Sequence, residues 1–111
     1  MLDEALKPKP KQRRVLVVVD ADPSTNPRAA EALRMAGGVG VWEQLDVHVA
    51  LCGLAVKAKG EGVAQLPEAR IIEQFLPMIR EHGGRVHVMP VATTDGKLAD
   101  LAAEFDSVMR F

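Results

Sequence analysis

The residues able to do chemistry lie where the apolar runs of this sequence end. The single thiol, Cys52, closes the run 46–52 and is followed directly by Gly53. A thiol in such a place can act as a nucleophile, carry a persulfide or sense oxidation when nearby positive charge, here Lys57 or Lys59, lowers its pKa. A free Cys at a strand end is more often a small buried hydrophobe. Composition alone favours this second interpretation, and Cys52 is kept as the candidate catalytic thiol.

Two carboxylates follow the first apolar run. Asp20 and Asp22 suit a paired-carboxylate or magnesium site, but Asp, Asn, Ser and Pro are also the residues of tight turns. We favour the turn, because nothing else in the chain obviously completes a metal shell, and we expect neither a metal nor a cofactor. Small-ligand binding at this edge is the alternative, with Asn26, Met89 and Thr93 as further candidates where the carboxyl ends of parallel strands meet.

The three histidines show no spacing typical of catalysis or metal binding. His48 and His87 fall in the middle of predicted strands, and they lie about 10 Å apart if the first strand runs between them. We interpret both as core residues. His82 ends a predicted helix, where partial positive charge suits the helix dipole. No glycine-rich phosphate-binding motif follows the first strand, so a nucleotide site is unsupported.

Four apolar runs predict the strands that position these residues. The run 14–20 has β-branched residues without polar alternation, which is typical of strands buried on both faces of a parallel sheet. Further strands are expected at 46–52, 85–89 and 107–111. The segment 53–65 is charged, contains glycine and has no periodicity, so it predicts a loop that could act as a mobile lid.

Helical periodicity separates the strands. A helix is expected from Pro27, capped by Asn26, through the paired glycines to about Glu43. Small residues at 36, 37 and 40 would let this helix approach a neighbouring backbone closely, and a second apolar stripe containing Trp42 suggests a subunit interface. A second helix from Pro67 should kink or restart at Pro77. A short third helix carries Leu98, Leu101, Ala102 and Phe105.

The alternation of strands and helices predicts one α/β domain over residues 14–111. The expected fold is a small doubly wound parallel sheet of about four to five strands, with helices on both faces. Residues 1–13 are basic and broken by proline, which is typical of a flexible tail. The chain of 111 residues is too short for two ordinary domains.

Composition excludes several classes of function. The net charge of −1 argues against nucleic-acid binding, and no apolar run is long enough to span a membrane. The first residues lack the pattern of a signal peptide, and the lone Cys agrees with a reducing compartment. We therefore expect a cytoplasmic protein without nucleic-acid or membrane partners.

The sequence resembles the DsrE/DsrF-like (YchN/TusBCD-like) family of small α/β proteins. The resemblance rests on the run 15–19 with its Asp/Pro turn, and on segments 28–36, 46–56, 84–88 and 105–111. It implies a flavodoxin-like/DsrE-like fold and homo-oligomers, often trimers or hexamers. In some members it also implies sulfur transfer to a protein partner through a cysteine persulfide. Those members carry the Cys at the end of the third strand, where this chain has Met89, and a thioether cannot hold a persulfide.

Three functional hypotheses follow. The first in rank is a non-catalytic oligomeric interaction subunit, favoured by Met89 and by the apolar surplus around Trp42. The second is a sulfur-relay protein that uses the displaced thiol of Cys52. The third is small-ligand binding at the carboxyl edge of the strands.

Overall fold

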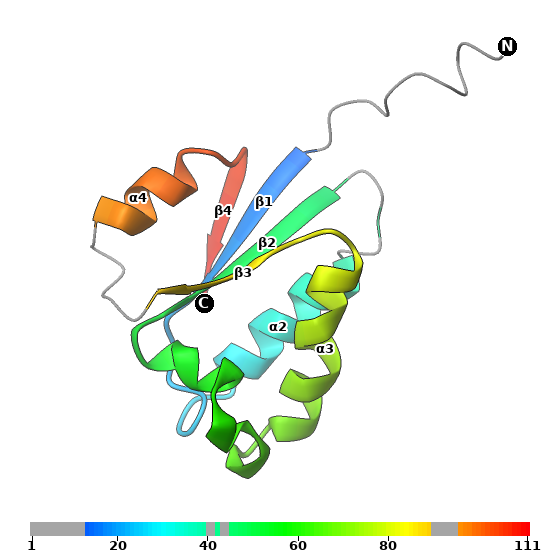
Figure 1. Ribbon diagram of the computed structural model, residues 1–111, viewed down its shortest axis with the longest axis vertical. Coiled ribbons are helices and arrows are strands. Elements are labelled where there is room, and N and C mark those ends of the chain that lie inside the picture. Colours follow the sequence, from blue (N-terminus) through cyan, green and yellow to red (C-terminus); the bar gives the residue numbers. More distant parts are fainter. Residues whose placement is uncertain (1–12, 40–41, 43–44, 90–95) are drawn as a thin grey trace, which may run out of the picture.

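The computed structural model describes residues 13–39, 42, 45–89 and 96–111, which form a four-stranded parallel sheet with helices on both faces. The elements follow in the order β1 (Arg13–Val19), α2 (Arg28–Val39), β2 (Leu45–Cys52), η1 (Gly53–Lys59), η2 (Glu61–Gln65), α3 (Ala69–Glu81), β3 (Val86–Met89), α4 (Gly96–Ala102) and β4 (Ser107–Arg110). The two η elements are 3₁₀ helices. Strand order in the sheet is β3-β2-β1-β4, and every pair is parallel (Figure 1).

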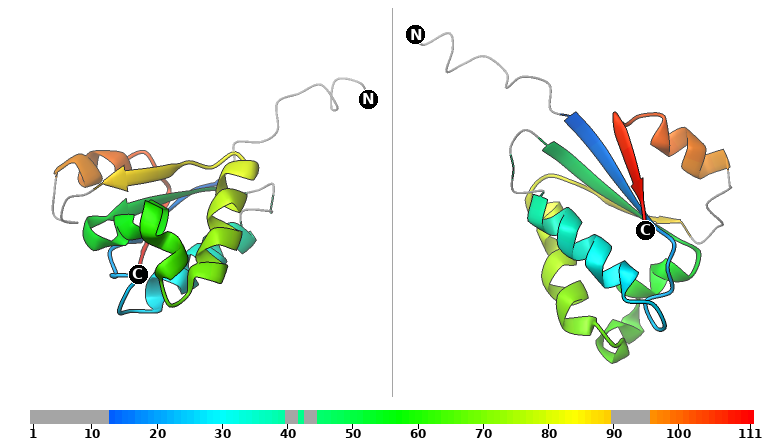
Figure 2. Two further views of the ribbon diagram at one scale, coloured as in Figure 1. Left: turned by 60° about the horizontal axis from the view of Figure 1, so that its bottom comes forward. Right: turned by 180° about the vertical axis from the view of Figure 1, so that it is seen from behind.

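Two apolar clusters hold the layers together. Alternate residues of β1 and β2, such as Val17 and Val49, pack with α2 and α3, where Leu33 and Ile72 are fully buried. The other face of the same strands packs against Leu98 of α4. Figures 1 and 2 show α2 and α3 together on one side of the sheet and α4 on the other. The predicted α/β fold with helices on both faces is confirmed.

Helix α2 approaches α3 closely, as its small residues predict. A Cβ atom added to Gly37 would lie 2.9 Å from the carbonyl oxygen of Phe75 and 3.1 Å from its Cδ1. The helix continues through Gly37 and Gly38 but ends at Val39, short of the expected end near Glu43, and Trp42 lies in a bend. Gly40 lies outside the described residues.

The segment 53–65 was expected to be a loop without periodicity, and this prediction was wrong. The segment winds into η1 and η2, and Ala55 and Ala58 of η1 are buried in the main core. Spaced three apart, these alanines lie on one face of a 3₁₀ helix, a period that a search for α-helical spacing does not detect.

The remaining boundaries agree with the pattern within a few residues. Pro77 lies inside α3, and Phe105 follows α4 instead of belonging to it. Of the predicted tail, Arg13 opens β1 and residues 1–12 lie outside the description. Within the described part of the chain, no helix is long and apolar enough to cross a membrane.

Candidate functional site

Cys52 and Met89 lie side by side at the carboxyl edge of the sheet. They are register partners on β2 and β3, which pair directly. Cys52 is fully buried and packs in the smaller apolar cluster with Val18, Ala50 and Leu98. Its Sγ makes a weak contact with the carbonyl oxygen of Ala50, at 3.9 Å. Met89 is half-buried against the same cluster. The thiol is therefore one strand spacing, about 4.8 Å, from the position where Met89 stands.

The surroundings of Cys52 disfavour its thiolate. Burial raises the pKa of the Cys52 thiol above its ordinary value, and the negative charge of Asp20 adds to this, while Arg110 acts in the opposite direction. The thiol is consequently protonated at neutral pH. Lys57, which the sequence suggested as an activating charge, binds Asp22 instead, with Nζ 3.2 Å from Oδ1. A protonated, enclosed thiol is a packing residue and a poor nucleophile.

The acidic loop after β1 forms a turn whose polar groups bind one another. Oδ1 of Asp22 accepts hydrogen bonds from the backbone N–H and hydroxyl of Ser24, at 3.0 and 2.7 Å. These two bonds, with a smaller contribution from Lys57, lower the pKa of the Asp22 carboxyl. Asn26 accepts a bond from the backbone N–H of Arg28, as a helix cap does.

Asp20 does not join Asp22 in a shared set of ligands. It is exposed, and its backbone N–H donates to the carbonyl oxygen of Phe111, at 3.0 Å. The described residues contain no group of three or more His, Cys, Asp or Glu able to hold a metal ion. Thr93, the remaining candidate, lies outside them. The geometry at this loop is that of turn chemistry.

The separation of about 10 Å between the two strand histidines was wrong. It assumed that β1 lies between β2 and β3, whereas β2 and β3 are neighbours. The rings of His48 and His87 are stacked with centroids 5.9 Å apart. Nε2 of His48 lies 2.9 Å from Oδ1 of Asp46, and Nδ1 accepts the backbone N–H of Arg85 at 3.3 Å. Because Nδ1 accepts, the ring proton is on Nε2 and is donated to Asp46.

Sequence reasoning missed this polar cluster, although a signal was present. Strands β2 and β3 share a motif in which a charged residue, Val, His and Val follow one another, at 46–49 and 85–88. Such alternation places polar residues on one face, in contrast to the apolar run of β1. The repeated Val-His-Val could have indicated that one side of these two strands is open.

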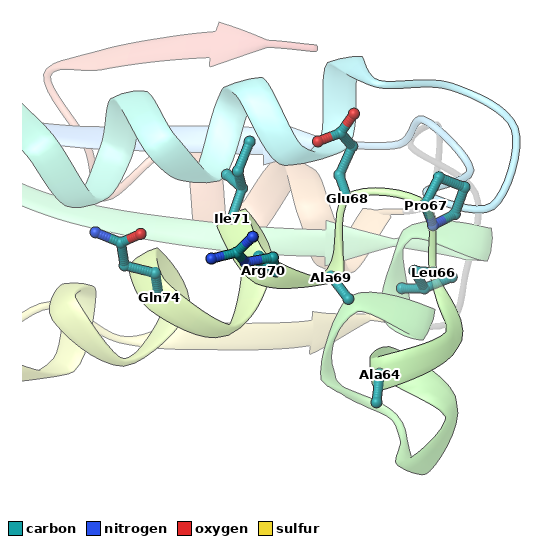
Figure 3. A pocket seen from close by; sticks show the side chains of 8 residues that line it. All are labelled: Ala64, Leu66, Pro67, Glu68, Ala69, Arg70, Ile71 and Gln74. Carbon is teal, nitrogen blue, oxygen red and sulfur yellow. The ribbon is translucent and has the colours of Figure 1, made fainter.

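A separate hollow of about 580 Å³ lies between η2 and the first turns of α3. Figure 3 shows its charged or amide-bearing side chains, Glu68, Arg70 and Gln74, with Leu66 and Pro67 at the end away from Gln74. Among the described residues, none that the sequence singled out for chemistry lines it.

Comparisons with known proteins support the fold. No family model matches the sequence, and a search of curated proteins gives no significant match. Among solved structures, the chain is similar to the YchN protein from E. coli, with a TM-score of 0.68 and 21% sequence identity over 90% of this chain and 100% of that one. At this identity the likeness establishes that the chain has a YchN-like fold.

Proposed function

We propose that this protein is a DsrE/DsrF-like subunit that works by associating with copies of itself or with another protein, without a nucleophilic thiol. The main support is the state of Cys52, which is fully buried and has a raised pKa beside a methionine. The YchN-like fold and the family resemblance of the sequence agree with this role.

Apolar surface provides a second line of support. Trp42 is 64% exposed and Leu54 is 58% exposed, and Val88 of β3 is 46% exposed. On the opposite edge of the sheet, Val108 and Met109 of β4 are also exposed. Large apolar side chains and unpaired strand edges in one small domain are features of association surfaces.

Light scattering at micromolar concentration tests the proposal. We expect a mass that is a multiple of the 12.0 kDa chain, three or six by the family resemblance. Two variants show whether an effect on the mass comes from one specific surface or from a general change in charge. Trp42→Glu changes the apolar surface, and the control Glu31→Gln changes the charge at an exposed residue of α2. A monomeric wild-type mass, with no mass gain in the presence of cell extract proteins, would contradict an association role.

A sulfur-relay function is the second candidate, and one observation favours it. Cys52 is in register with Met89, beside the position that bears the carrier Cys in related proteins. In such a step the Cys52 thiolate attacks the terminal sulfur of a donor persulfide, a new S–S bond forms, and the donor leaves as a thiolate.

Intact mass spectrometry distinguishes the two candidates. After incubation with a persulfide donor, a relay protein gains the mass of one sulfur atom, and Cys52→Ser abolishes the gain. The interaction-subunit proposal predicts no gain in the native wild-type protein. A gain that depends on Cys52 would reverse the ranking.

A further inference from the structure

A pocket of about 450 Å³ opens on the α4 side of the sheet, away from the carboxyl edge. Asp46 and His48 of β2 and His87 of β3 line it from the sheet, while Leu101 and Phe105 line it from the end of α4 and the turn that follows. Its volume is within the range of small-molecule sites, about 300–1,000 Å³.

The pocket exists because α4 is short. Its seven residues place Leu98 over Leu16, Val18 and Ala50. Leu16 is level with His48, and Val18 and Ala50 lie further along the strands. Toward the amino ends of the strands, the same face of the sheet carries Asp46 and His48 in place of apolar residues. A parallel sheet normally buries apolar side chains on both faces, so this polar half-face is a departure that calls for an explanation.

Some of the polar groups around the pocket are already bound to each other. Oδ2 of Asp46 accepts a hydrogen bond from Nε of Arg14 at 3.3 Å, and Oδ1 binds His48. The Arg14 guanidinium also lies 4.6 Å from the centre of the Phe105 ring and donates to the carbonyl oxygen of Glu104 at 3.0 Å. The Phe105 ring meets His48 edge-on, with centroids 5.1 Å apart. These contacts build a fixed wall in which the charges of Arg14 and Asp46 offset each other.

Two groups of the pocket have no such partner among the described residues. The exposed side chain of Arg85 makes no ion pair or hydrogen bond with any of them. Nε2 of His87 is buried and lacks a hydrogen-bond partner there. A guanidinium supplies paired N–H donors that match a carboxylate.

We propose that this pocket binds a small organic anion, a carboxylate attached to an apolar group. Arg85 binds the carboxylate in a bidentate manner, and the imidazole of His87 lies beside it as a polar neighbour. Leu101 and Phe105 contact the apolar group. This site is separate from the carboxyl edge, and it does not depend on the association role proposed above.

The charges around His87 give the site a pH dependence. His87 faces His48 on β2, Arg85 just before β3 and Glu104 after α4, with Arg14 and Asp46 on the far wall of the pocket. Burial is the main cause that lowers the pKa of His87, and the neighbouring His48 and Arg85 add to it, opposed by Glu104. A bound anion favours the protonated ring, so binding takes up a proton and strengthens as pH falls below neutral.

Benzoate and benzamidine form a matched pair of probes for this site, because the two differ in charge but hardly in shape. In titrations followed by NMR, benzoate should produce saturable shifts of the amide resonances of Arg85, His87 and Phe105. Benzamidine should leave them unchanged. Inorganic phosphate, which lacks an apolar group, should bind more weakly than benzoate.

Two arginine variants test whether Arg85 is the residue that binds the carboxylate. Arg85→Gln should weaken benzoate binding at least about tenfold, because it removes a charged hydrogen-bond partner from an exposed position where folding is unaffected. Arg34→Gln, at an exposed residue of α2 on the opposite side of the sheet, should bind benzoate like the wild type. Thermal unfolding of both variants checks that they are folded.

Several outcomes would overturn the proposal. These are the absence of saturable shifts at millimolar benzoate, equal responses to benzamidine, phosphate binding as tight as that of benzoate, and equal loss of binding in the two arginine variants. A benzoate affinity that rises with pH would also contradict the placement of the carboxylate beside His87.

Discussion

At the scale of single residues, burial decides what Cys52 can do. The sequence places a thiol at the end of a strand, which is also what the structure has. Sequence could not show that α4 covers this end with Leu98, because that contact joins residues 46 positions apart through the packing of a helix on a sheet. Whether Leu98 covers Cys52 is what separates the interpretation of this thiol as a small hydrophobe from its interpretation as a nucleophile.

Cys52 should therefore be unreactive in the native protein. We expect a disulfide thiol reagent to label the native wild type at least about a hundredfold more slowly than the protein in denaturant, since opening of the core precedes attack. Labelling is measured by absorbance or by mass. A double variant, Cys52→Ser with Met89→Cys, provides the control, because Met89 is half-buried and a thiol there is more accessible. Rapid labelling of the native wild type would refute this expectation.

At the scale of elements, the sequence predicted the positions of strands and helices along the chain better than it predicted which elements lie next to each other in space. Periodicity identifies the four strands and three α-helices to within a few residues. It does not give the order of the strands, because that depends on the side of β1 to which each crossover returns. The adjacency of β2 and β3 brings His48 and His87 together, so the polar pocket could not be located from spacing alone.

Replacement of two neighbouring glycines of α2 by alanine should change the stability of the protein in opposite directions. Gly37→Ala places a methyl group 2.9 Å from a carbonyl oxygen of α3. It should destabilise the protein by about 1–2 kcal/mol, a net value that includes the gain in helix propensity. Gly38 is exposed, and a Cβ atom added there meets no atom of the described residues within 4 Å, so Gly38→Ala should stabilise the protein by about 0.5–1 kcal/mol. Urea unfolding measures both. Equal effects of the two substitutions would contradict the close approach of α2 and α3.

At the scale of the whole molecule, two of the groups with shifted pKa values, His87 and Cys52, predict how stability depends on pH. The pKa of His87 is lowered, so the unfolded chain binds more protons than the folded one below about 6.5, the ordinary value. Stability should fall as pH decreases through that window toward the folded pKa of His87. The pKa of Cys52 is raised, so the folded chain holds its proton longer and stability should fall as pH rises above 9.0.

Chemical unfolding from pH 4 to 11 checks this profile, with the highest stability expected between the two windows. His87→Gln should reduce the slope on the acid side, and Cys52→Ala should reduce it on the alkaline side. An acid slope that is unchanged by His87→Gln would assign the acid loss of stability to other groups.

The position of β1 has a consequence for the order in which the chain can fold. β1 is the most apolar strand and is flanked by β2 and by β4, and its Arg14 N–H reaches the carboxylate of Asp106 across 92 residues. During synthesis, β1 emerges long before β4. The backbone N–H and C=O groups of β1 that pair with β4 therefore have no partner strand until almost the whole domain has been made. The nascent chain must carry an open, apolar strand edge through this interval, when pairing with another chain competes with the last step of folding.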